Sequence, residues 1–92
     1  MGNQELDTLI ELAKQGGKAS ASALSSALGV SRFNLYRRAY VLGDEGCIAE
    51  DGRGDQGMTY TITGAGWDAL RDYRRALEIE LEVIQRMIAA PA

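Results

Sequence analysis

Two short apolar segments on either side of one glycine constrain the fold of this chain more than any other feature of its sequence. Leu24 and Leu28 lie one helical turn apart, and Gly29 follows directly. Glycine takes the left-handed backbone conformation at little cost, so a helix can end there and the chain can turn sharply. Ser31 is a good N-cap for the next helix, whose apolar residues recur at helical spacing: Leu35, Ala39 and Leu42. The sequence therefore predicts two helices that cross at a tight turn.

A β-hairpin is predicted after these helices. Residues 47–49 form a short apolar segment, and residues 58–62 alternate and are rich in β-formers, so we expect two paired strands. Between them, residues 50–57 hold three glycines and no apolar side chain, which predicts a loop.

Helices are also predicted at both ends of the chain. Apolar residues at helical spacing indicate a helix over residues 4–14, with Asn3 as its N-cap. Thr63 is the expected cap of a longer helix over residues 65–90, and Pro91 lies just past its end. The predicted fold class is mainly α with a small β-hairpin.

The long C-terminal helix carries more apolar surface than a small domain can cover. Its apolar residues fall in two series, one being Leu70, Tyr73, Leu77, Leu81, Ile84 and Ile88, the other Ala76, Ile79, Val83, Met87 and Ala90. A helix that rests once on a domain needs a single stripe about 100° wide. Spacings of three and four in alternation are typical of paired helices. We therefore expect a homodimer with an interface of Leu77, Leu81, Ile84 and Ile88.

Composition excludes most catalytic chemistry. The chain has 92 residues, no histidine and a single cysteine, Cys47. Histidine-dependent nucleophiles, histidine metal ligands, internal disulfides and cysteine clusters are therefore impossible within one chain. We expect no catalytic residues, no metal site and no cofactor, and hence no enzyme. No apolar run approaches the roughly 20 residues of a membrane helix, and the N-terminus lacks a signal-peptide pattern, so the expected location is the cytoplasm without membrane contact.

Charge is segregated along the chain, although the net charge is −3. No carboxylate lies between Glu11 and Asp44, and this stretch contains Lys14, Lys18, Arg32, Arg37 and Arg38. A polyanion responds to the local field rather than to the net charge, so an acidic chain can still present a basic face.

The order of these elements, with three groups of residues, resembles the winged helix-turn-helix family of DNA-binding regulators. Residues 20–31 (SASALSSALGVS) resemble the second helix and turn of that family. Leu35, Leu42, Gly46 and Ile48 resemble the end of its recognition helix and the entry to its wing. Residues 60–66 (YTITGAG) resemble the strand-to-helix junction of MarR- and PadR-type regulators. The resemblance covers about residues 5–70.

This resemblance implies that the helix after Ser31 reads the major groove of double-stranded DNA. Arg32 and Arg37 offer forked donors for guanine or phosphate, and Asn34 can pair with adenine. Phe33 suits contact with a thymine methyl group. Phosphate contacts are expected from Ser31, Arg38 and Tyr40, and from Lys18 near the start of the preceding helix. Tyr36 lies on the same outward face and is also expected to contact DNA.

Arg53 suits minor-groove or phosphate contact from the wing. The wing departs from the basic pattern that is usual in the family, because it also carries Glu50, Asp51 and Asp55. These carboxylates repel phosphates, so Arg53 is the only wing residue that we assign to DNA.

The predicted organisation is a winged helix-turn-helix DNA-binding domain over residues 1–63 and a dimerisation helix over residues 64–92. The expected function is a dimeric transcriptional repressor on a palindromic site. Two alternatives stay open: a winged-helix module that binds protein instead of DNA, favoured by the acidic wing, and a plasmid or phage protein for DNA segregation or packaging. Cys47 fits a buried strand position better than a redox sensor. Trp67 and Tyr73 fit packing better than an effector pocket, so no small-molecule effector is expected.

Overall fold

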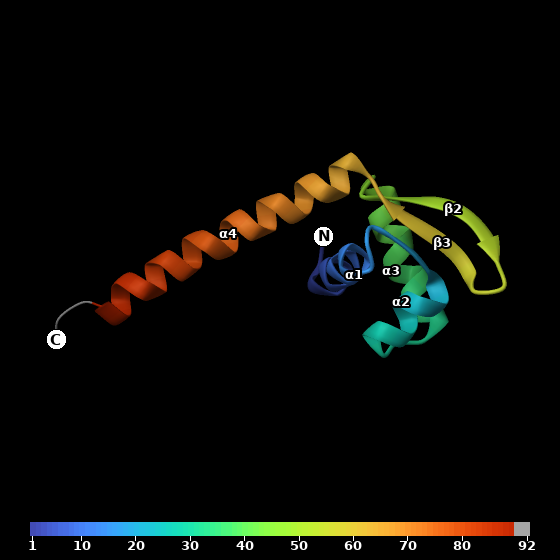
Figure 1. The fold of residues 1–92 in the computed structure, drawn as a ribbon, viewed down its shortest axis with the longest axis horizontal. Coiled ribbons are helices and arrows are strands. Elements are labelled where there is room, and N and C mark those ends of the chain that lie inside the picture. Colours follow the sequence, from blue (N-terminus) through green and yellow to red (C-terminus); the bar gives the residue numbers. More distant parts are fainter. Residues whose placement is uncertain (90–92) are drawn as a thin grey trace.

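The computed structural model describes residues 1–89 and contains four helices and three strands. In chain order these are α1 (Asn3–Lys14), β1 (Lys18–Ser20), α2 (Ala21–Leu28), α3 (Arg32–Asp44), β2 (Ile48–Gly54), β3 (Gly57–Ile62) and α4 (Gly64–Ala89). The predicted fold class is confirmed. Figure 1 shows α1, α2 and α3 gathered beside the β2–β3 hairpin, while α4 leaves this body as a single rod. The predicted end of α4 at Ala90 and Pro91 lies outside the described residues.

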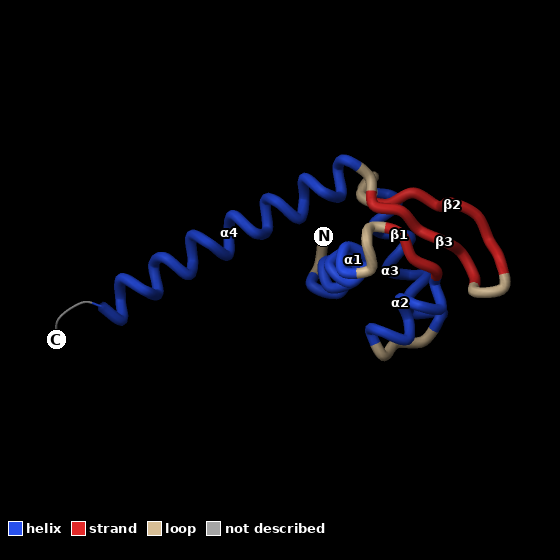
Figure 2. Tube along the Cα trace, viewed as in Figure 1, coloured by secondary structure: helices blue, strands red, loops and turns tan. Residues whose placement is uncertain are grey.

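The sheet has the antiparallel order β1-β3-β2, with β3 in the middle (Figure 2). The prediction of a loop over residues 50–57 is wrong for all but two of these residues. Strand β2 continues to Gly54, which pairs with Gly57, and only Asp55 and Gln56 form the turn. Pairing with β3 supplies backbone hydrogen bonds that need no apolar side chain, so an exposed edge strand forms from glycines and charged residues.

Leucines from the three N-terminal helices form the centre of the core. The most deeply buried of them are Leu9, Leu12, Leu24, Leu35 and Leu42. Ile48, Tyr60 and Ile62 close the core from the sheet side. The apolar residues of α2 and α3 thus face one common interior, as their spacing predicted. In α1 the buried residues are Thr8, Leu9 and Leu12.

Side-chain caps set the start of α2 and α3. The Ser20 hydroxyl accepts a hydrogen bond from the Ala23 amide, and the Ser31 hydroxyl accepts one from the Asn34 amide, each at 3.1 Å. Gly29 ends α2 with a φ of 68°, which confirms the glycine turn. The expected cap Asn3 is wrong, because helix α1 already includes it and Gly2 is the N-cap. The Glu5 carboxylate accepts a hydrogen bond from the Gly2 amide, so α1 begins one residue earlier than predicted.

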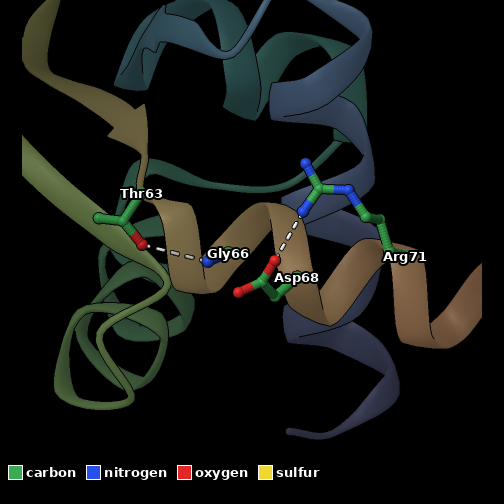
Figure 3. A network of polar contacts seen from close by, with 4 residues as sticks. All are labelled: Thr63, Gly66, Asp68 and Arg71. Carbon is green, nitrogen blue, oxygen red and sulfur yellow. Dashed lines mark hydrogen bonds and ion pairs between the residues drawn. The ribbon is translucent and has the colours of Figure 1, made fainter.

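Helix α4 begins against the sheet and then projects away from it. Thr63 is confirmed as its cap: the Thr63 hydroxyl accepts a hydrogen bond from the Gly66 amide at 3.1 Å (Figure 3). The same hydroxyl donates to the Gly46 carbonyl and so fixes the helix start on the body. Every described residue from 71 onward is exposed. The projecting helix raises the radius of gyration to 15.9 Å, against about 12 Å for a compact chain of this length.

None of the helices within residues 1–89 combines the length and the apolar character that crossing a bilayer requires.

Candidate nucleic-acid interface

The exposed face of α3 carries two arginines and two aromatic residues and no carboxylate over its first three turns. Phe33 is 81% exposed and Tyr40 is 77% exposed, although both are large aromatic side chains. Arg32 and Arg37 are exposed beside them. Leu35, Ala39 and Leu42 are buried on the opposite face of the helix. The helix period therefore directs the basic and aromatic side chains outward together.

The start of α3 is a suitable place for an anion. Ser31 caps the helix through its hydroxyl and is itself exposed, so the start of α3 lies at the surface. The helix dipole adds a partial positive charge at this end.

The β2–β3 hairpin rests on the first turns of α3. The guanidinium carbon of Arg53 lies 5.6 Å from the centre of the Tyr36 ring, a cation–π geometry. Burial raises the pKa of the Tyr36 hydroxyl, but hydrogen bonds from the Met58 backbone and the Arg32 side chain and the nearby arginine charges outweigh it, so the net pKa is lowered. Arg32, Tyr36 and Arg53 thus form one basic cluster that spans helix and hairpin.

Gly57 permits this close approach. Its φ is +84°, and a Cβ placed on it would lie 2.7 Å from the Tyr36 hydroxyl oxygen and 2.8 Å from Arg32 Nη1. The turn of the hairpin is also tied to α2, because the Ser22 amide donates to the Gln56 carbonyl at 3.0 Å. The hairpin therefore continues the surface that α3 begins instead of standing apart from it.

Arg38 and Asn34 face α1 rather than this cluster. Arg38 Nε donates to Asn34 Oδ1 at 2.7 Å, and Arg38 Nη1 lies 3.4 Å from both the Gln4 carbonyl oxygen and the Thr8 hydroxyl oxygen. Thr8 is buried and donates to the Gln4 carbonyl. The two α3 side chains therefore join α3 to α1, and the Asn34 oxygen that would accept from adenine is occupied by Arg38. Contact of either residue with DNA stays a prediction.

Replacing Arg38 with alanine is expected to lower the free energy of unfolding by about 1 kcal/mol, because it removes hydrogen bonds between α3 and α1. Arg37→Ala is the matched control: it removes the same charge one position earlier, where the side chain is exposed, and should change stability by less than about 0.5 kcal/mol. Urea unfolding of both variants measures the difference. Equal effects would contradict a structural role for Arg38.

Lys18 is paired rather than free. Its ammonium group lies 2.7 Å from a carboxylate oxygen of Asp51 across the outer face of the sheet. The hydrogen bond from Lys18 and its positive charge lower the pKa of Asp51 below the usual value, so the Asp51 carboxyl is ionised at neutral pH. Asp51 sits at an irregularity of β2, between Glu50 and Gly52 in the register with β3. A phosphate that approached Lys18 would have to compete with this carboxylate.

The remaining candidates lie elsewhere. Cys47 is buried, and burial together with the charge of Glu45 raises the pKa of its thiol, which favours the core interpretation over a redox sensor. Trp67 lies in the first turns of α4, where its ring packs against Gly17, and it is 38% exposed. Leu77, Leu81, Ile84 and Ile88 are exposed along α4, 45% to 79%.

Two solved structures, both of transcriptional regulators, have a fold similar to that of this chain. The organohalide-sensing regulator RdhR, in its 2,4-dichlorophenol-bound form, matches with a TM-score of 0.69 at 18% identity, over 100% of this chain and 54% of its own. The antimony-specific transcriptional repressor AntR matches with a TM-score of 0.66 at 19% identity, over 91% of this chain and 73% of its own. The fold is that of the winged-helix regulators. In a winged-helix fold, α3 has the position of the recognition helix and the β2–β3 hairpin has the position of the wing.

This winged-helix chain spans only about half the length of RdhR. No family model matches the sequence, and no curated protein matches it either. The two winged-helix structures do not support the expectation that small-molecule effectors are absent, since one is described as organohalide-sensing and the other as antimony-specific.

Sequence reasoning missed the residues that dock the wing. Ser22, Gln56 and Gly57 hold the wing turn against α2 and α3. The only sequence signal was the glycine itself, which marked a turn but not the neighbour that it approaches. The partners of Arg38 were also missed, because they lie 30 and 34 residues away along the chain.

Proposed function

We propose that this protein is a dimeric transcriptional repressor that binds a specific double-stranded DNA sequence and occupies an operator. The observation that carries the proposal is the exposed face of the recognition helix, where Arg32, Phe33, Arg37 and Tyr40 lie outward. A helix of this kind fits the major groove, where arginine forks bind guanine edges and phosphates. The wing adds Arg53 to the same surface through its contact with Tyr36.

Residues 1–63 would bind DNA and residues 64–92 would pair two chains. The exposed Leu77, Leu81, Ile84 and Ile88 on α4 support pairing, because a row of large apolar side chains in water is costly. Two recognition helices related by two-fold symmetry would read a palindrome with half-sites about 34 Å apart. Pairing also makes the second contact intramolecular and so strengthens binding without new side-chain contacts.

An interaction module that binds protein is the second candidate, and the charge of the wing favours it. Glu50, Asp51 and Asp55 are all exposed on the wing, and the sequence pI is about 4.8. A basic partner protein would suit these carboxylates better than phosphates do.

Selection of bound duplexes from a random pool by the purified 92-residue chain distinguishes the two candidates. The repressor proposal predicts enrichment of one palindromic sequence. Recovery of an unchanged pool, from protein that is helical by circular dichroism, would favour the protein-binding alternative.

Replacing Arg37 with alanine is expected to weaken binding to the selected duplex by about 1–3 kcal/mol, because a groove contact is lost. Fluorescence anisotropy titration measures the change. Arg75→Ala is the matched control, since it removes the same charge from an exposed position on α4. Equal losses in the two variants would mean that only net charge matters and that Arg37 does not read DNA.

A further inference from the structure

The apolar row along α4 has the same spacing in both chain directions. Its members are Leu70, Tyr73, Leu77, Leu81 and Ile84, with steps of three, four, four and three residues. At about 100° per residue, all of them lie within about 40° of the direction of Leu77. The last four are 37% to 55% exposed in the single chain. Reversing the helix about Leu77 therefore places each apolar side chain of the row on an apolar position.

One flank of this row changes sign at the same midpoint. The helical period places Arg71, Arg74, Glu78 and Glu82 on one side of the row, between about 60° and 140° from Leu77. Both arginines precede Leu77, both glutamates follow it, and all four are exposed. In a two-fold antiparallel pair, equivalent flanks face each other. Reversal about Leu77 then places Arg74 between Glu78 and Glu82 of the second copy.

The charged residues of this flank also form ion pairs within the single chain. These pairs are Arg71 with Asp68, Arg74 with Glu78 and Glu82 with Arg86. All six side chains are at least 60% exposed, and exposed pairs of this kind contribute little to stability. The same charges can therefore be shared with a second copy.

A parallel pair in register matches these charges less well. It would set the flank against the opposite flank of the second copy, where Asp72 and Glu80 are the only charged side chains between residues 70 and 84. Glu78 and Glu82 would then meet carboxylates instead of guanidinium groups. Charges beside an apolar row set the direction in which helices pair, so this pattern favours the antiparallel arrangement.

A depression at the start of α4 agrees with the same register. Trp67, Leu70, Arg71 and Arg74 line an open hollow of about 270 Å³. In the reversed pair, Ile84 of the second copy lies opposite Leu70 and beside this hollow. The Trp67 ring, which is 38% exposed in the single chain, would then be covered.

We propose that two copies of this chain pair in antiparallel direction through α4, with the two-fold axis at Leu77. The inference rests on the proposed pairing through α4 and adds its direction and register. Leu70 then faces Ile84 of the second copy, and Tyr73 faces Leu81. Gly64 precedes Leu77 by 13 residues, so the two α4 helices begin about 39 Å apart. The two winged bodies therefore lie at opposite ends of the helix pair.

Disulfide cross-linking of chains with one introduced cysteine tests direction and register. A Tyr73→Cys chain would be mixed under reducing conditions with a Leu81→Cys chain that carries a mass tag, and the mixture would then be oxidised. The antiparallel register places these positions opposite each other, so the mixed pair should cross-link at least about tenfold more than Leu81→Cys alone. Two copies of residue 81 would be about 12 Å apart along the axis, and a disulfide cannot bridge Cα atoms more than about 7 Å apart.

Two controls separate this inference from the proposed pairing. Leu77→Cys should cross-link with itself in either direction, and the native chain, whose Cys47 is buried, should not cross-link. If Leu77→Cys does not cross-link and the native chain sediments as a monomer, both the pairing and the inference fail. If the chain is dimeric but Leu81→Cys cross-links with itself, or the mixed pair does not form, pairing stands and the antiparallel register is overturned.

Discussion

Gly66→Ala is expected to destabilise the protein by about 3 kcal/mol, the upper end of the usual cost of overpacking. A Cβ on Gly66 would lie 2.2 Å from the Cys47 carbonyl oxygen and 2.7 Å from a methyl carbon of Ile62. The first contact is with backbone, so no rotamer change relieves it. Helix α4 would have to move off the sheet, away from the Thr63 cap that holds its first turn (Figure 3). Urea unfolding at a fixed protein concentration measures the loss.

Gly64→Ala is the matched control for this substitution. Gly64 is also in the first turn of α4, but a Cβ there would meet nothing within 4 Å. Alanine is the better helix former, so this variant should be neutral or more stable by up to about 1 kcal/mol. Equal destabilisation by both substitutions would show that the contact with Cys47 does not set the cost.

If two chains pair through α4 as proposed, Leu81→Asp is expected to convert the dimer to a monomer. Leu81 is 55% exposed in the single chain and lies in the middle of the stripe that includes Leu77 and Ile84. In a two-fold pair the substitution would place a carboxylate in the apolar interface of each copy. A cost of about 3 kcal/mol in total for those two unpaired charges would weaken association by more than 100-fold. Sedimentation equilibrium gives the association constant.

Gln85→Asp is the control for the new charge, because Gln85 is an exposed polar residue of the same helix outside the row Leu77, Leu81, Ile84 and Ile88. It should weaken association much less than Leu81→Asp does. The native chain should be dimeric, and truncation after Arg71 should make it monomeric. A native chain that sediments as a monomer at all concentrations would contradict pairing through α4.

The helical part of this fold was predictable because its signals are local. Ser20, Ser31 and Thr63 cap amides only three residues away, so each helix start follows from neighbouring residues. Gly29 likewise needs only its own backbone freedom. The extent of β2 was not predictable, because its exposed glycines and acids carry no strand signal of their own. Their pairing with β3 decides the structure there.

The candidate DNA surface was predictable in its helical part and not beyond it. Burial of Leu35 and Leu42 on one side of α3 leaves Phe33, Arg37 and Tyr40 on the other, a direct consequence of the helical period. Neighbouring side chains on a helix differ in direction by about 100°. Arg37 therefore reaches solvent, whereas Arg38 reaches α1 through partners that no local pattern reveals.

Contacts between distant segments also determine which of the other expected DNA-binding cations are free. Lys18 pairs with Asp51 because β1 and β2 flank β3 in one sheet, and the two side chains lie on the same face of that sheet. Arg53 lies over Tyr36 because the wing folds back on α3. Both contacts join residues that are far apart in the sequence, so charge patterning alone could not show which cations are free.

The salt dependence of duplex binding tests the central claim most directly. The 92-residue chain would be titrated by anisotropy against a labelled duplex from the selection, or against pooled random duplexes if none is enriched. The salt concentration would range from about 50 to about 200 mM, over which phosphate contacts are distinguished. Arg32, Arg37 and Arg53 from two chains offer four to six phosphate contacts, so the slope of log affinity against log salt should be about −4 to −5. No binding at the lowest salt by folded protein, or an affinity independent of salt, would contradict the account.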